Sequence, residues 1–204
     1  KYIMGAAMME PDIRIVTNQL GFCREHFHKM LGMGNRLSLA LMLDSHLQYV
    51  AQQLPEAEEK KPGRLGKLKK YDGESPAPQM LGQAKSCYVC RRAAEFEQKY
   101  ISNVVYIWKK DPAFQEKLRA QPYFCLEHAA LLLAQGQKDL SETGYLTFSR
   151  DILELCRNKL KDLSAHVTEF CRSFDHENAG KPLSPEARSA VEDAVAFLSG
   201  DFQR

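Results

Sequence analysis

The sequence predicts an all-α protein: two duplicated helical units, each with a C-x-x-C / F-C-x-E-H metal-site pattern, followed by a C-terminal helical segment. Three observations support this prediction. Apolar residues recur at helical spacing over long runs. No stretch shows sustained alternation of apolar and polar residues between hairpin turns. A short cysteine- and histidine-containing motif occurs twice. The 204-residue chain is 44% hydrophobic and 26% charged, which is typical of globular proteins.

The first part of the chain contains one clear helical run, residues 35–54, with little β-branching. Four apolar residues lie there at helical spacing: Leu39, Leu43, Leu47 and Val50. Residues 55–85 are rich in charge, glycine and proline, and we interpret them as a flexible charged linker. Its basic sequence KKPGRLGKLKK could contact an anion or nucleic acid, but no interleaved aromatic residues support that reading.

Local signals define the later helices, expected over residues 91–110, 113–119, 124–135, 145–174 and 184–198. Pro112 ends the first of these helices, because the residue before a proline is disfavoured in helical conformation. Gly136 is the expected αL cap at the end of the third. The last begins with Ser184 as N-cap and Pro185 at the first helical position.

An internal repeat relates residues 22–34 to residues 124–136. Both segments read F-C-x-E-H and continue to a leucine and a glycine in the same register. Six positions are identical: Phe22 and Phe124, Cys23 and Cys125, Glu25 and Glu127, His26 and His128, Leu31 and Leu133, Gly34 and Gly136. Because cysteine and histidine are rare residue types, this agreement favours duplication over chance.

A C-x-x-C motif, Cys87 and Cys90, precedes the second copy. Aligning the KYI sequences at residues 1–3 and 99–101 places the equivalent pair before residue 1, so we expect an N-terminal C-x-x-C in the natural protein. The expected domains are a first repeat lacking that motif, a linker, a second repeat with a complete Cys₃His site, and C-terminal helices: residues 1–54, 55–85, 86–144 and 145–204.

The chemistry of these residues indicates zinc. Three sulfurs and one imidazole are a standard closed tetrahedral zinc set, which the second repeat offers as Cys87, Cys90, Cys125 and His128. Helix N-termini, where both motifs lie, also favour thiolate over thiol. We expect Cys23 and His26 to bind metal in the complete protein. Spacing leaves open whether ligand pairs match within one repeat or across the two.

Other cysteines and histidines are weaker candidates. Cys156 lies on an apolar helical stripe and is expected in the core. Cys171 and His176 could be additional ligands, whereas His28 and His46 are expected to be ordinary helix residues.

The chain resembles a family of uncharacterised bacterial and archaeal proteins catalogued as domain of unknown function 6062. The resemblance covers most of the chain, in the segments MEPDIRIVTNQLGFCREHF, NRLSLALMLDSHL, YVCRR, YFCLEH and FCRSFDHENAGKP. It implies an N-terminal C-x-x-C before the first F-C-x-x-H, in agreement with the projected repeat. It also weakens the case for His176 as a ligand, since relatives often have the sequence FDY, with tyrosine in place of this histidine, where this chain has FDH. It implies no activity.

The composition of the chain disfavours several classes of function. A net charge of +2 does not favour nucleic-acid binding, and no apolar run is long enough for a membrane span. Six cysteines in a long chain without a signal sequence suggest a reduced compartment, the cytoplasm. We therefore expect a zinc-binding, non-enzymatic module that binds an unidentified protein partner and has no catalytic residues. The alternative is an iron–sulfur or dithiol redox protein using the same ligands. Hydrolysis by a Cys–His pair is less favoured, because other ligands lie nearby.

Overall fold

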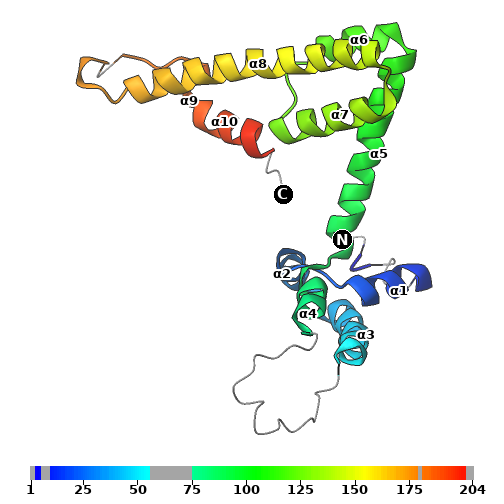
Figure 1. Ribbon diagram of the computed structural model, residues 1–204. Helices are drawn as coiled ribbons and strands as arrows, with labels where there is room; N and C mark the ends of the chain where they lie inside the picture. Colours follow the sequence, from blue (N-terminus) through cyan, green and yellow to red (C-terminus); the bar gives the residue numbers. More distant parts are fainter. Residues whose placement is uncertain (1–2, 6–9, 56–74, 179–180, 201–204) are drawn as a thin grey trace, which may run out of the picture. The chain divides into compact units, whose positions relative to one another are not determined.

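The computed structural model describes residues 3–5, 10–55, 75–178 and 181–200 (Figure 1). All regular elements within these residues are helices, which confirms the all-α prediction. They are α1 (Pro11–Leu20), α2 (Arg24–Gly32), α3 (Arg36–Gln53), α4 (Ala77–Lys85), α5 (Tyr88–Lys110), α6 (Pro112–Arg119), α7 (Leu126–Asp139), α8 (Glu142–Arg172), a 3₁₀ turn (His176–Asn178), α9 (Pro185–Arg188) and α10 (Ala190–Ser199). The chain forms two compact units, residues 1–95 and 96–204.

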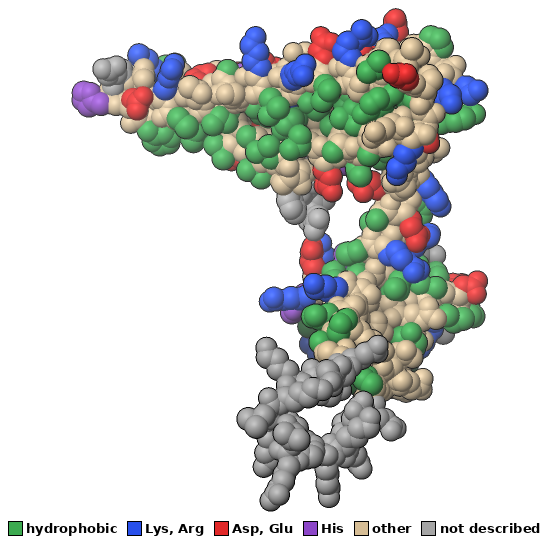
Figure 2. Space-filling view, viewed as in Figure 1, with side chains coloured by type: hydrophobic (Ala, Val, Ile, Leu, Met, Phe, Trp, Pro, Cys, Tyr) green, Lys and Arg blue, Asp and Glu red, His purple; other side chains and the backbone are tan. Residues whose placement is uncertain are grey.

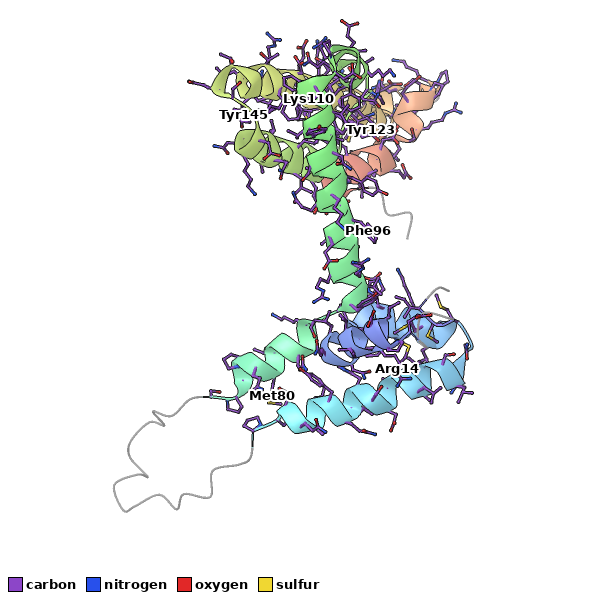
Figure 3. All side chains as sticks on the ribbon, turned by 90° about the vertical axis from the view of Figure 1, so that its right-hand side faces the viewer. Arg14, Met80, Phe96, Lys110, Tyr123 and Tyr145 are labelled. Carbon is purple, nitrogen blue, oxygen red and sulfur yellow. The ribbon has the colours of Figure 1, made fainter. Side chains whose placement is uncertain are left out.

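The first unit contains α1 to α4 and the beginning of α5. Helix α1 packs against α3, and Arg14 joins them: its Nη2 donates to the Leu41 carbonyl at 3.2 Å and to Ser45 Oγ at 2.9 Å (Figure 3). The buried core of this unit is small and rich in methionine, a flexible residue that fills irregular gaps: Met4, Phe22, Met30, Leu39, Met42 and Cys87.

The second unit contains the rest of α5 and α6 to α10. Helices α7 and α10 both pack against α8, and Trp108 meets Phe148 edge to face with ring centroids 5.1 Å apart. Cys156 lies in the buried core of the second unit, as the sequence predicts. The members of this core are Ile101, Val105, Trp108, Leu118, Ala129, Leu132, Phe148, Ile152, Cys156, Leu163 and Phe197. Helices α8 and α10 therefore share one core with α5, α6 and α7.

Not all apolar side chains of the second unit are buried. Figure 2 shows hydrophobic side chains gathered along α8 on this unit. Six exposed apolar residues come from α8 and α10: Leu146, Leu153, Leu160, Val191, Val195 and Leu198.

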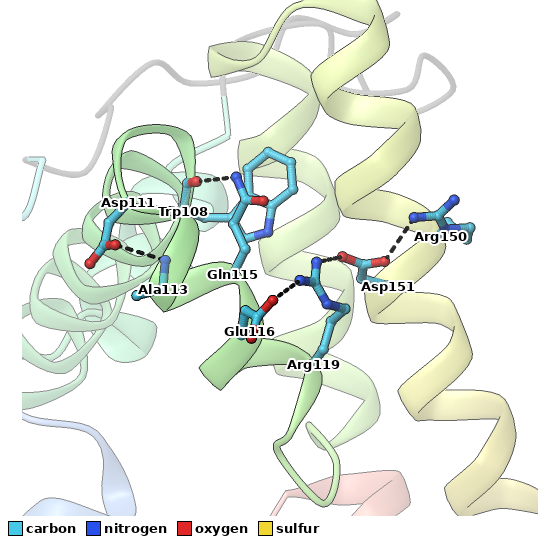
Figure 4. A network of polar contacts seen from close by, with 8 residues as sticks. All are labelled: Trp108, Asp111, Ala113, Gln115, Glu116, Arg119, Arg150 and Asp151. Atoms are coloured by element: carbon cyan, nitrogen blue, oxygen red, sulfur yellow. Dashed lines mark hydrogen bonds and ion pairs between the residues drawn. The ribbon is translucent and has the colours of Figure 1, made fainter.

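A buried carboxylate joins α6 to α8 (Figure 4). The Asp151 side chain is 3% exposed, and its two oxygens accept from Arg119 at 3.2 Å and from Arg150 at 3.4 Å. Asp111 caps α6 by accepting from the Ala113 backbone N–H at 2.9 Å. Because an unpaired buried charge is costly, the Arg119–Asp151 pair fixes the position of α6 on α8.

Helix boundaries agree with the sequence in most places. Helix α3 confirms the run expected over residues 35–54, and Asn35 caps it by accepting from the Ser38 N–H. Helix α5 begins at Tyr88, ahead of the expected start at residue 91. Ser184 is the N-cap of α9 as expected, but Ser189 separates α9 from α10, so the single helix expected over residues 184–198 is interrupted.

Two expectations from glycine- and proline-containing segments were wrong. Gly136 lies inside α7, not at its C-terminus. A Cβ at Gly136 would lie 2.8 Å from Phe148 Cδ1, so the glycine is needed for close helix packing. Within the expected linker, residues 77–85 form α4, and Gln79 Nε2 donates to the Gln53 carbonyl at 2.7 Å. Residues 56–74 of that linker lie outside the described residues.

Candidate metal centre

Four candidate ligands come together in the first unit. The atoms Cys23 Sγ, His26 Nδ1, Cys87 Sγ and Cys90 Sγ all lie within 4.8 Å of one another, and we call this group the Cys₃His cluster. His26 Nδ1 is 3.2, 3.5 and 3.6 Å from the three sulfurs, in chain order. The sulfurs of Cys23 and Cys90 are 3.8 Å apart, so they are not joined in a disulfide.

These separations are those of ligands around one ion. With Zn–S near 2.3 Å and Zn–N near 2.0–2.1 Å, a tetrahedral site has S–S edges of about 3.8 Å and S–N edges of about 3.5–3.6 Å. The sulfur–sulfur distance between Cys23 and Cys90, and the sulfur–nitrogen distances from Cys87 and Cys90 to His26, agree closely with these values. The Cys23–His26 contact at 3.2 Å is somewhat shorter. The cluster could therefore hold one metal ion in tetrahedral coordination.

Each half of the cluster lies at the start of a helix. Cys23 is the N-cap of α2, with φ −69° and ψ 166°, and His26 lies in the first turn of that helix. Cys87 immediately precedes α5, and its carbonyl accepts from the Arg91 N–H at 3.0 Å. Unpaired N–H groups and the helix dipole favour negative charge at both places, so the thiolates that a metal requires are stabilised.

Hydrogen bonds between loops bring the two halves together. Ser86 Oγ donates to the Leu20 carbonyl at 2.5 Å, and the Tyr88 N–H donates to the Gly21 carbonyl at 3.0 Å. These bonds place the C-x-x-C against Cys23. They occur between residues 66 and 67 positions apart, so periodicity in the sequence does not reveal them.

Gly21 is the residue that permits this loop geometry. Its φ is +57°, a left-handed conformation that disfavours other residues, and a Cβ there would collide with the His46 ring. His46 Nδ1 lies 2.7 Å from the Asn18 carbonyl and therefore donates to it. His46, on α3, thus joins that helix to Asn18 of α1. The sequence did contain a sign that Gly21 is special: the two copies of the motif differ at the residue before phenylalanine, which is Gly21 in the first and Tyr123 in the second.

The close approach of the thiols in the Cys₃His cluster shifts the pKa values of Cys23 and Cys90 in opposite directions. Burial raises the pKa of Cys23, but contacts with His26 and the other two thiols outweigh it and lower the pKa to about 7. Burial and the neighbouring Cys87 and Cys23 together raise the pKa of Cys90 to about 12. One thiolate therefore forms readily in the metal-free protein, whereas the last proton leaves only if a cation replaces it.

Aromatic side chains and a groove adjoin the cluster. Phe22 is buried and meets the Phe27 ring edge to face at 5.4 Å. Both rings also line an apolar groove of about 550 Å³ between α2, α3 and α4. Its apolar lining comes mainly from six residues: Phe22, Phe27, Leu43, Leu47, Val50 and Met80.

The cluster corrects the expected ligand pairing. Cys87 and Cys90 lie with Cys23 and His26, and not with Cys125 and His128 as we expected for a complete second site. The pairing across the two F-C-x-E-H motifs, which spacing left open, is the one in the structure. Cys125 and His128 lie in the second unit, with Sγ and Nδ1 3.0 Å apart. Neither Cys171 nor His176 belongs to a group of three or more ligand atoms among the described residues.

The comparisons with known proteins give a family without an activity. The model of a family described as a family of unknown function (DUF6062) matches residues 1–204. No curated protein matches the chain, and no solved structure does. None of the helices within the described residues is both long and apolar enough to cross a bilayer.

Proposed function

Because the chain belongs to the DUF6062 family of unknown function, we propose its role from the metal centre: a zinc-binding helical protein whose first unit is held together by the Cys₃His cluster. The observation that carries this proposal is the convergence of four ligand atoms within 4.8 Å from two segments of the chain. A structural zinc ion there would join the start of α2 to the start of α5 and so add to the folding free energy.

The dimensions of the cluster favour a single ion over an iron–sulfur cluster. An iron–sulfur cluster holds its protein ligands on different iron atoms, so those ligands are spread over a body larger than one ion. The four ligand atoms here lie within 4.8 Å of one another, and the Cys23–Cys90 and Cys87–His26 separations match edges of one tetrahedron around zinc. A dithiol redox role is disfavoured because the C-x-x-C sulfurs face an imidazole and a third thiol and not each other alone.

The proposed role is not enzymatic. Four protein ligands complete a tetrahedral zinc site, and no coordination position remains for a water or substrate. Because the ligands are thiolates, the site requires a reducing environment, and we place the protein in the cytoplasm. All six cysteines are free thiols in the structure, which is compatible with that placement.

We further propose that the first unit binds a protein partner through the groove between α2, α3 and α4. Leu47 and Met80 on its lining are 63% and 50% exposed, which is costly unless another apolar surface covers them. The partner class that fits is an amphipathic helix, because its apolar face can occupy such a groove. Leu47→Asp should abolish binding in a pull-down with zinc-loaded protein, and Leu37→Asp, an exposed position on α3 outside the groove, should not.

Metal analysis of purified protein tests the zinc site. Protein purified under reducing conditions should be colourless and contain zinc, and Cys87→Ser should contain about one zinc ion less per chain. Cys171→Ser is the matched control, since Cys171 is an exposed cysteine outside the cluster. Brown protein with stoichiometric iron and sulfide would instead establish the iron–sulfur alternative. Equal zinc content in Cys87→Ser and the parent protein would show that the ligand assignment is wrong.

A further inference from the structure

The second Cys–His pair, in the second unit, has the same local geometry as the first. Cys125 is the N-cap of α7 with φ −60° and ψ 159°, close to the −69° and 166° of Cys23 at the start of α2. Cys125 Sγ lies 3.0 Å from His128 Nδ1, and the corresponding distance in the first pair is 3.2 Å. Both pairs therefore present a sulfur and an Nδ1 atom side by side at the start of a helix.

Glu97, on α5, fixes the orientation of the second imidazole. Its Oε1 lies 3.1 Å from His128 Nε2, so the carboxylate accepts the proton on that nitrogen. A neutral imidazole has only one N–H, and the lone pair is then on Nδ1, beside the Cys125 sulfur. Histidines that bind metals commonly donate their other N–H to a carboxylate in this way. Sequence spacing alone did not indicate Glu97.

The second pair is an incomplete ligand set. Among the described residues, the Cys₃His cluster is the only group of three or more potential ligand atoms close enough for one ion. Cys125 and His128 offer two ligands, and a tetrahedral ion needs two more. The His128 side chain is 49% exposed and Cys125 is partly exposed, so the missing ligands can approach from outside the chain.

Exposed apolar side chains flank the pair. Leu126, directly after Cys125, is 46% exposed. Tyr100, one helical turn after Glu97, is 69% exposed. A second protein surface that brought ligands to the pair would cover these side chains and gain free energy from their burial.

We propose that Cys125 and His128 are half of a second zinc site, with Glu97 as a positioning residue, and that in the 204-residue chain the same pair from a second copy completes it. A two-fold axis through the ion would make both copies contribute equally, as in most homodimers. The result is a Cys₂His₂ set, a regular structural zinc site. Two thiolates balance the charge of Zn²⁺, and their protons pass to the solvent. The proposal uses none of the Cys₃His ligands.

Zinc titration of the metal-free 204-residue chain, with mass measured by light scattering, tests this proposal. We expect about 1.5 zinc ions per chain and a zinc-dependent dimer, because one ion is shared by two chains. Cys125→Ser should bind about one ion and stay monomeric. Cys171→Ser, at an exposed cysteine outside both groups, should behave like the parent chain.

A second variant tests the role of Glu97. Glu97→Gln preserves the shape of the side chain but removes the carboxylate, so it should weaken the zinc affinity of the dimer by about 10- to 100-fold. It should leave zinc binding by Cys125→Ser unchanged when the two substitutions are combined. An equal zinc affinity in Glu97→Gln and the parent chain would refute the positioning role.

The remaining outcomes separate the two zinc proposals. A monomer with about one zinc ion at saturation, unchanged by Cys125→Ser, would overturn the second site. A monomer with about two ions would overturn the sharing between copies. If instead Cys125→Ser removed all bound zinc, the proposed Cys₃His function would have failed while the second site stood.

Discussion

Removal of zinc is expected to destabilise the first unit and leave the stability of the second unchanged. The buried core of the first unit consists of six side chains, and one of them is the ligand Cys87. The second unit has eleven buried side chains in one cluster. Direct hydrogen bonds between the segments that carry the cluster are few: Ser86 to Leu20 and Tyr88 to Gly21. The first unit therefore depends on the ion far more than the second.

The size of the effect follows from binding linkage. At a free zinc concentration 1,000 times the Kd, an ion that binds only the folded state stabilises it by about 4.1 kcal/mol. The first unit spans residues 1–95, and for domains of this size 1 kcal/mol shifts the Tm by about 4–8 °C. Zinc should therefore raise the Tm of the first unit by about 16–32 °C.

Calorimetry and hydrogen exchange together measure this effect. The experiment uses Cys125→Ser, so that metal at the second Cys–His pair does not contribute. Chelation should lower one of two thermal transitions and increase exchange in α1, α2 and α3, with α7 and α8 unchanged. The reasoning is refuted if amide protection of α1 to α3 is the same with and without zinc.

Three further outcomes are expected. Gly21→Ala should reduce zinc affinity and stability, because it adds a clash with the His46 ring to a backbone cost of about 1–2 kcal/mol. Gly34 is also at positive φ but has open space around it, so Gly34→Ala should show only the backbone cost in denaturant titrations and should bind zinc normally. Arg119→Ala should destabilise the second unit by about 1–3 kcal/mol at neutral pH, since it leaves buried Asp151 with only the exposed Arg150, whereas Arg150→Ala should cost less than about 1 kcal/mol in the same urea titration. Zinc binding at pH 7.5 should release more than one proton, because burial and the neighbouring thiols raise the pKa of Cys90 to about 12. Titration calorimetry in buffers of different ionisation enthalpy measures the number of protons released. A release of less than one proton contradicts the assignment of thiolate ligands.

The helices could be predicted because their signals are local. The run over residues 35–54 has an N-cap asparagine and regular apolar spacing, and it forms α3. The break at Ser189 and the position of Gly136 inside α7 could not be predicted from local signals. Gly136 is required by the Phe148 ring, which is contributed by another helix, so its role depends on tertiary packing.

The candidate ligands could be identified from the sequence, but which of their motifs meet in the fold could not. A C-x-x-C and a C-x-x-H identify thiolate and imidazole ligands by chemistry alone. Which motifs meet depends on loop contacts between distant residues, and two copies of one motif make the local signals nearly equal. The Ser86–Leu20 and Tyr88–Gly21 hydrogen bonds decide the pairing, and neither leaves a periodic trace in the sequence.

The two copies of F-C-x-E-H differ most informatively at the residue before phenylalanine. In the first copy this residue is Gly21, whose positive φ turns its carbonyl toward the Tyr88 N–H and so brings the C-x-x-C to its own motif. In the second copy it is Tyr123, whose ring packs near Phe197 at 5.9 Å and beneath the Lys159 ammonium at 4.6 Å. A tyrosine cannot adopt the glycine conformation without strain, and its ring is already used in the core of the second unit. This one difference thus accounts for a Cys–His pair that meets the C-x-x-C in the first unit and a Cys–His pair that does so in no described part of the second.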